Sequence, residues 1–160
     1  MAEPGISGPI EPRTLGRVGW HELTSSDWEA GFAFYSAMFG WKKDQAFPMG
    51  AMGTYQTFSG ADGAMIGGMM NRPPNAPTSY WTYYFNVGDI DAAAKRVKAG
   101  GGEILNGPME VSDGSWIVEC MDPQRARFAL VGKRSPNPIG YFERVAPRDP
   151  SDPRGRRWSW

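Results

Sequence analysis

An offset of 62 residues aligns the two halves of this 160-residue chain without a gap. The offset places Asp27 on Asp89, Ala30 on Ala92 and Gly40 on Gly102, and the pattern of apolar residues agrees along both halves. Such self-similarity is typical of two copies of one supersecondary unit, neither of which buries its apolar face alone. The chain is therefore predicted to fold as two similar units packed together.

Each half reads as a strand, a helix and three further strands. Aromatic and apolar residues at 18–23 and 80–87 favour strands. Asp27 and Asp89 follow where a side-chain oxygen can cap a helix, and apolar residues then recur at helical spacing as far as Gly40 and the glycines at 100–102. Turn residues separate the later strands, expected at 41–47, 54–59, 64–70, 103–105 with an extension, 115–121 and 126–131. The predicted fold class is α+β.

The repeat also gives the domain boundaries. We expect an N-terminal arm at 1–15, one domain at 16–132 and a Pro- and Arg-rich C-terminal tail at 133–160, which holds Trp158 and Trp160. Within the domain, module one spans 16–70 and module two 78–132. The linker at 71–77 contains three prolines and is predicted to be stiff and extended.

Composition excludes several classes of function. The formal net charge is zero, but from Lys133 onward seven Lys and Arg stand against three Asp and Glu, a balance of +4 that leaves −4 on the body. A body of that sign does not attract nucleic acid. No apolar stretch reaches the ~18 residues of a membrane span, and the first residues lack a signal-peptide pattern, so no membrane partner and a cytoplasmic location are expected. The single Cys120, in an apolar run, is predicted to be a buried structural thiol.

Several motifs, in order, resemble one known superfamily. The chain is similar to glyoxalase-like proteins of the vicinal oxygen chelate (glyoxalase/bleomycin resistance protein/dioxygenase) superfamily at Trp20-His21-Glu22-Leu23, Asp27, 33–35, Phe39-Gly40-Trp41, 83–87, 90–93, Gly101-Gly102, Gly107-Pro108, Asp122-Pro123-Gln124 and 126–130. The resemblance covers about 16–132. It implies two tandem βαβββ modules whose mixed sheet curls into an open barrel around a cleft.

The resemblance also locates the positions that hold a divalent metal in other members. These positions correspond here to Trp20, Gly67, Thr82 and Ala129. Their side chains cannot replace four nitrogen or oxygen ligands, so no metal and no other cofactor is expected. The single His21 is adjacent to one of these positions, and strand alternation points it away from the cleft, although a register error of one residue would turn it inward.

The same alternation places Glu22 in the cleft beside Thr82 and Tyr84. Burial would raise the pKa of the Glu22 carboxyl and suit it to act as a general base, with Tyr84 or Thr82 donating a hydrogen bond. The alternative is structural: Glu22 pairs with an Arg, Tyr84 or a backbone amide and holds the modules together. Side chains predicted to line the cleft and contact a ligand are Trp20, Tyr55, Tyr80, Trp116 and Met69, with core packing the alternative for the methionine.

Two functions therefore stay open. The first is a glyoxalase/bleomycin-resistance-like protein that binds a small organic molecule between its modules without metal. The second is a glyoxalase-like lyase or isomerase that uses Glu22 as a base. A dioxygenase is disfavoured, because an Fe(II) centre needs two histidines and the chain has one. A homodimer is expected, since Trp81 and Tyr83 lie on strand faces away from the cleft and need covering.

Overall fold

The computed structural model describes residues 13–136 and contains the predicted repeat. Module one comprises β1 (Val18–Ser25), α1 (Trp28–Phe39), β2 (Lys42–Pro48), the short 3-10 helix η1 (Gly50–Met52), β3 (Thr54–Ser59) and β4 (Met65–Asn71). Module two comprises β5 (Tyr80–Asp89), α2 (Ile90–Ala99), β6 (Glu103–Glu110), β7 (Trp116–Met121) and β8 (Arg127–Lys133). Moved by 62 residues, β3 and β4 coincide with β7 and β8. The predicted α+β class and the order of elements are confirmed.

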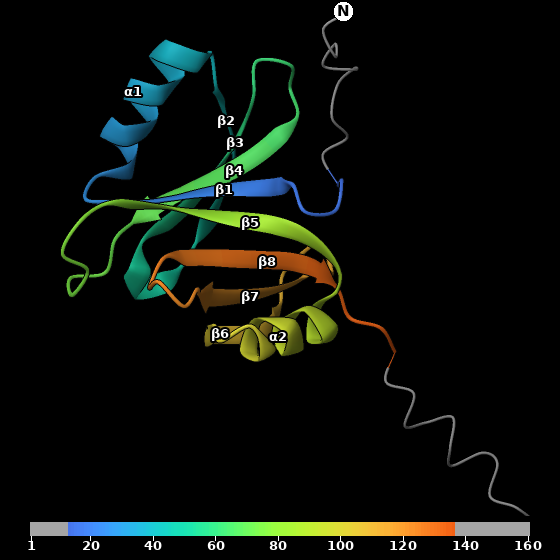
Figure 1. Cartoon of the computed structure of the whole chain (residues 1–160). Helices are drawn as coiled ribbons and strands as arrows, with labels where there is room; N and C mark the ends of the chain where they lie inside the picture. Colours follow the sequence, from blue (N-terminus) through green and yellow to red (C-terminus); the bar gives the residue numbers. More distant parts are fainter. Residues whose placement is uncertain (1–12, 137–160) are drawn as a thin grey trace, which may run out of the picture.

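All eight strands form one curled, open sheet in the order β2-β3-β4-β1-β5-β8-β7-β6. Strand β1 pairs antiparallel with β5 at the centre, and each pairs in parallel with the last strand of its own module. The two modules therefore join within one chain. Figure 1 shows α1 and α2 at opposite ends of the sheet, with β1 and β5 running between them.

Both helices begin and end as the sequence predicts. Asp27 accepts hydrogen bonds from the amides of Glu29 and Ala30, and Asp89 accepts one from Ala92. Gly40 ends α1 in the left-handed conformation, at φ 67°, which glycine adopts without steric cost. None of the described helices is long and apolar enough to cross a bilayer.

Each helix covers its own core on the same face of the sheet. Trp28 and Phe32 of α1 pack against Leu23, Phe58 and Met69 of the sheet. Ile90, Ala93 and Ala94 of α2 pack against Val118, Cys120 and Leu130 of the sheet. Cys120 is fully buried, which confirms the predicted structural thiol, and burial raises its pKa to about 11. We call this face the helix-bearing face and the opposite one the helix-free face.

Among the differences between the two modules, the one that affects the centre of the sheet is a β-bulge at Ile66 in β4. Phe58 pairs with Gly67 and Ser59 with Met65, so Ile66 is passed over, whereas β7 and β8 pair without a break. The bulge advances the rest of β4 by one position, so that Glu22 pairs with Gly68, although Tyr84 pairs with Ala129. Because side chains alternate between faces, each residue of β4 after the bulge lies on the opposite face from the equivalent residue of β8.

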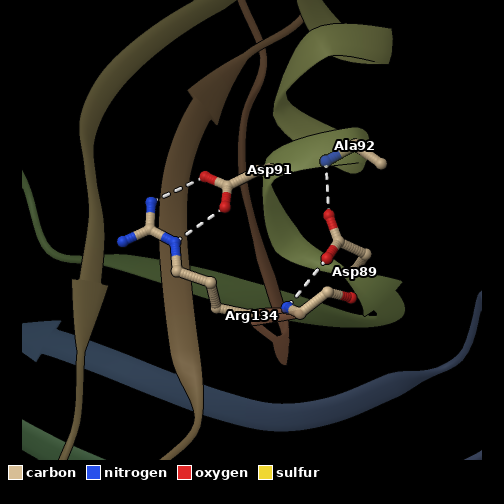
Figure 2. Close-up of polar contacts among 5 residues, drawn as sticks. Asp89, Asp91, Ala92 and Arg134 are labelled. Carbon is tan, nitrogen blue, oxygen red and sulfur yellow. Dashed lines mark hydrogen bonds and ion pairs between the residues drawn. The ribbon is translucent and has the colours of Figure 1, made fainter. Parts of the chain in front are cut away.

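The chain beyond β8 is attached to the start of α2. Arg134 makes two hydrogen bonds to the Asp91 carboxylate, at 2.6 and 2.7 Å, and its guanidinium lies 3.9 Å from the centre of the Trp116 ring. The Ser135 amide donates to Asp89, which also caps Ala92 (Figure 2). These hydrogen bonds lower the pKa of Asp89 to about 2. The first residues of the predicted tail are therefore part of the fold.

The linker differs from its prediction. The Ala76 amide donates to the carbonyl of Pro73, and the Arg72 side chain donates to the carbonyl of Ala76, so the segment contains a turn and is not fully extended. Most of the predicted arm at 1–15 and of the tail, including Trp158 and Trp160, lies outside the described residues.

A substitution at Gly67 tests the position of the bulge in β4. A Cβ added there would lie 2.2 Å from the backbone oxygen of His21 and 2.4 Å from the Phe58 ring. Gly67→Ala is therefore expected to destabilise the fold by roughly 1–3 kcal/mol in urea unfolding. Gly88→Ala is the matched control, because a Cβ there meets nothing within 4 Å. Equal stability of the two variants would contradict the described register of β4.

Candidate functional site

The candidate site lies at the centre of the helix-free face, where the two modules join. Alternate residues of β1 point to this face, and in the β1–β5 ladder Trp20 pairs with Tyr84 and Glu22 with Thr82. Glu22 and Tyr84 are equivalent positions of the repeat. The structure thus brings together all three predicted catalytic residues, Glu22, Thr82 and Tyr84, together with Trp20.

A hydrogen-bonded network surrounds the Glu22 carboxylate. The Tyr55 hydroxyl donates to Oε2 at 2.9 Å, and the Tyr84 hydroxyl donates to Oε1 at 3.2 Å. The Trp20 indole in turn donates to the Tyr55 hydroxyl at 2.9 Å. Glu22 is only 9% exposed and forms no ion pair within residues 13–136. Tyr84 is one of the alternative partners of Glu22 that the sequence analysis left open. Tyr55 is a second partner, which was predicted only as a ligand contact.

Gly68 makes this network possible. It is the residue of β4 that pairs with Glu22 after the bulge. A Cβ on Gly68 would lie 2.3 Å from the Tyr55 ring, so any larger residue would displace the phenol from the carboxylate. The bulge and the glycine together position Tyr55.

Electrostatics at the site favour the neutral forms of its acids. Burial raises the pKa of Glu22, the hydrogen bonds from Tyr55 and Tyr84 partly oppose this, and the nearby charge of Glu119 raises it further. Burial, and then the negative charge of Glu22, raises the pKa of both tyrosines above the usual range. Both phenols therefore remain protonated hydrogen-bond donors over the physiological pH range.

The positions that hold metal in other members lack a suitable set of ligands. Trp20, Thr82 and Ala129 share the helix-free face, but the prediction that Gly67 joins them is wrong. The bulge turns Gly67 toward Phe58 on the helix-bearing face and puts Gly68 in its place. In the part of the chain that the structure describes, no three His, Cys, Asp or Glu residues lie close enough to hold an ion. An indole, a hydroxyl, a methyl and a glycine do not fit a divalent cation.

His21 lies on the helix-bearing face, as strand alternation predicts. Its Nδ1 is 2.9 Å from the backbone oxygen of Ile66, and because a carbonyl only accepts, Nδ1 must be the donor. Its ring packs edge-on against Tyr83. His21 thus binds the carbonyl of the bulged residue and lies away from Glu22.

Of the other three predicted ligand contacts, Tyr80 shares the helix-free face with Glu22, whereas Met69 and Trp116 do not. Tyr80 lies on the helix-free face, where Arg127 stacks over its ring at 5.2 Å. Met69 is fully buried beneath α1, because the bulge reverses its face. Trp116 packs beneath α2, since it shares the alternation of Val118 and Cys120.

Sequence reasoning missed Glu119. This half-buried carboxylate pairs with Ala129 and lies between Val118 and Cys120, whose burial beneath α2 turns Glu119 to the helix-free face. Alternation along the run 116–121 could have found it, because an acidic residue between two buried apolar ones must face the other side. Its charge raises the pKa of Glu22 and Tyr84.

A sequence profile of the Glyoxalase/Bleomycin resistance protein/Dioxygenase superfamily matches residues 16–130. The chain belongs to this superfamily. It is 33% identical over 129 residues to the anthracycline biosynthesis protein DnrV of Streptomyces peucetius, with 72% of this chain and 46% of that protein covered. It is 29% identical over 118 residues to the putative glyoxylase CFP32 of Mycobacterium bovis, with 72% and 45% covered. The chain thus spans a little under half the length of these relatives.

Solved structures confirm the glyoxalase-type fold. A methylmalonyl-CoA epimerase variant from Streptomyces coelicolor superposes with a TM-score of 0.55 at 19% identity, covering 76% of this chain and 100% of that one. The epimerase from Mycobacterium tuberculosis gives a TM-score of 0.55 at 13% identity, covering 77% and 93%. At these identities the likeness concerns the fold alone.

The raised pKa of Glu22 predicts how stability depends on pH. The folded state holds this proton more tightly than the unfolded chain, whose ordinary value is 4.5. The contribution of Glu22 to stability should therefore be lost as pH rises from about 4.5 through the higher native pKa. In denaturant unfolding, the free energy of unfolding of the natural protein should fall relative to that of Glu22→Gln as pH rises through that window. Replacing the exposed Glu110 by Gln serves as the control.

If the difference in unfolding free energy between the natural protein and Glu22→Gln stays constant with pH, the pKa of Glu22 is not raised.

Proposed function

We propose that the helix-free face binds a small organic molecule without a metal ion. Glu22 would supply the polar contact, and the aromatic side chains of Trp20, Tyr55, Tyr80 and Tyr84 would supply the apolar ones. The observation that carries this proposal is the buried Glu22 carboxylate at the junction of the modules, held by two phenols and by no cation among residues 13–136.

The energetics of Glu22 support a role in binding. Burying a carboxylate costs several kcal/mol, and two neutral donors offset only part of that cost. An apolar pair at the same place would join the modules at least as firmly. A ligand that donates a hydrogen bond to Glu22 would be favoured there, because the half-buried Glu119 adds negative charge. The name of one relative agrees with small-molecule chemistry, since it is an anthracycline biosynthesis protein.

Metal analysis tests the absence of an ion. Protein purified without chelator and then loaded with Zn²⁺, Ni²⁺ or Mn²⁺ should retain well below one equivalent after desalting, since Trp20, Gly68, Thr82 and Ala129 offer no adequate ligand set. Stoichiometric retention at this face would overturn the metal-free proposal.

The alternative is a lyase or isomerase, which the raised pKa of Glu22 favours. Burial raises the pKa of the Glu22 carboxyl, and a carboxylate of raised pKa is a stronger general base than an ordinary one. It could take a proton from the carbon next to a carbonyl, leaving the electron pair in an enolate. Tyr84 or Thr82 could then donate a hydrogen bond to the enolate oxygen. A dioxygenase stays disfavoured, because the chain has one histidine.

Glu22→Gln separates the two candidates. A panel of aromatic alcohols, amines and ketones would be screened by thermal shift, because a ligand of the folded state raises the melting temperature. Under the binding proposal, Glu22→Gln should change the affinity of a hit by about tenfold or less, since one hydrogen bond is altered. Under the enzymatic alternative, the same variant should abolish turnover of that compound.

Two controls locate the ligand. Tyr55→Phe removes one donor to Glu22 and should also alter affinity, whereas Tyr35→Phe on the helix-bearing face should not. If every hit binds Glu22→Gln and Tyr55→Phe as it binds the natural protein, the ligand lies elsewhere and the proposed site is wrong.

A further inference from the structure

One acidic and one basic side chain share a row of the helix-free face without pairing. Glu22 pairs with Thr82 in the antiparallel β1–β5 ladder. Tyr84 pairs with Ala129 in the parallel β5–β8 ladder, so Arg127, two positions earlier on β8, is level with Thr82. Glu22 and Arg127 therefore lie on the two strands that flank β5. At the usual strand spacing, their Cα atoms are about 10 Å apart.

Tyrosines hold the two charged groups apart. The Arg127 guanidinium stacks over the Tyr80 ring, 5.2 Å from its centre, and forms no ion pair within residues 13–136. The Glu22 carboxylate instead accepts hydrogen bonds from Tyr55 and Tyr84. Along β5, Tyr80 and Tyr84 lie on opposite sides of the row that Glu22 shares with Arg127. The stacking therefore draws the guanidinium away from the Tyr84 side of the site.

Other acidic side chains of this face do not neutralise Arg127 either. Met121 pairs with Arg127 on one side and with Glu103 on the other, so Glu103 is the acid of the same row in β6. Glu103 is already bound by Arg125, at 2.9 Å. Glu119 lies two residues before Met121 on the same face of β7 and forms no ion pair in the described part of the chain. Arg127 thus presents a free cation at one side of an acidic centre.

A buried hydroxyl group lies beside Tyr80. Thr24 pairs with Tyr80 in the β1–β5 ladder and, two residues from Glu22, points to the same face. It is 1% exposed, and its Oγ1 has no hydrogen-bond partner among residues 13–136. Such unpaired buried hydroxyls are uncommon, which makes this one a candidate contact for a bound molecule. Met70, its neighbour in β4, is unbranched and flexible, so a shift of the Met70 side chain can open a path to Oγ1.

We propose that the ligand of the helix-free face carries a carboxylate that binds Arg127. The inference rests on the proposed function, because it concerns the same bound molecule. A guanidinium donates two parallel hydrogen bonds to a carboxylate, and stacking on Tyr80 orients its plane for them. The Thr24 hydroxyl can donate to the same group. One guanidinium balances one negative charge, so a carboxylate fits better than a phosphate dianion, which Glu119 would repel.

The positions of the charged groups define the ligand class. Tyr80 and Thr82 are successive residues on this face of β5, ~7 Å apart. The group that meets Arg127 over Tyr80 and the group that meets Glu22 beside Thr82 are therefore separated by about the length of one substituted aromatic ring. The ligand is an aromatic carboxylic acid with a hydrogen-bond donor at its other end.

The acid and amide of one compound test the carboxylate contact. para-Hydroxycinnamate and its neutral amide share a flat ring and a phenol donor and differ in charge. In calorimetric titration of the full chain, the acid should bind at least ~10-fold more tightly, because hydrogen bonds between charged groups are stronger than neutral ones. Equal affinity for the two compounds, or no binding of the acid at about 5 mM, would overturn the inference.

Variants of two neighbouring arginines locate the contact. Arg127→Met should abolish the preference for the acid and leave binding of the amide nearly unchanged. Arg125→Met is the matched control, because Arg125 is also exposed but is bound to Glu103, and it should keep the preference. If Arg127→Met still prefers the acid, the carboxylate binds elsewhere and the inference is wrong.

Thr24→Val separates a ligand contact from a structural role. The variant removes a buried hydroxyl that lacks a partner, so its melting temperature should equal or exceed that of the natural protein. Its preference for the acid over the amide should nevertheless fall about threefold or more, since one donor is lost. An unchanged preference would contradict the contact between Thr24 and the carboxylate.

The inference and the proposed function fail in different ways. If acid and amide bind equally but both lose affinity in Glu22→Gln, the site stands and only the carboxylate contact is wrong. If both compounds bind Glu22→Gln and Tyr55→Phe as they bind the natural protein, the proposed site is wrong and the inference falls with it.

Discussion

The antiparallel pairing of β1 with β5 is the constraint on which the rest of the domain depends. It converts two open four-stranded units into one eight-stranded sheet. It also fixes which side chains meet at the junction: Glu22 with Thr82, and Trp20 with Tyr84. A shift of one residue would exchange the two faces, turning His21 and Tyr83 to the helix-free face and moving the Glu22 carboxylate beneath the helices. The site and the two cores therefore depend on the same hydrogen-bond ladder.

Most of the fold could be predicted from the sequence because its signals are local. The aromatic runs, the capping aspartates and the glycines that end each helix specify their own elements, and the 62-residue offset shows that the pattern occurs twice. The strand expected at 54–59 coincides with the observed β3. Strand alternation also placed Glu22, Tyr84 and Thr82 on one face and His21 on the other, since it needs only the parity of positions within one strand.

The sequence does not reveal where the alternation of side chains between the two faces is interrupted. The bulge at Ile66 is a property of pairing between strands, and although glycines inside a strand, such as Gly67 and Gly68, often mark a bulge, they do not specify which residue is bulged. A single extra residue was enough to move Met69 into the core and to exchange Gly67 for Gly68 beside Glu22. The prediction for Trp116 was wrong for another reason. Its aromatic side chain suggested a ligand contact, but Trp116 lies on the same face of β7 as Val118 and Cys120, beneath α2.

The near-symmetry of the repeat has a consequence for how a guest molecule is oriented. Glu22 and Tyr84 occupy equivalent positions, yet one accepts hydrogen bonds and the other donates them. The bulge adds a second difference, because Gly68 leaves room for the Tyr55 ring in module one, whereas Leu130 occupies the equivalent residue number in module two and packs beneath α2. The backbone thus offers two related half-sites, while the side chains give them opposite polarity. If a compound binds across this junction, as proposed, it meets a hydrogen-bond acceptor on one side and a phenol on the other, so its two end-to-end orientations are not equivalent.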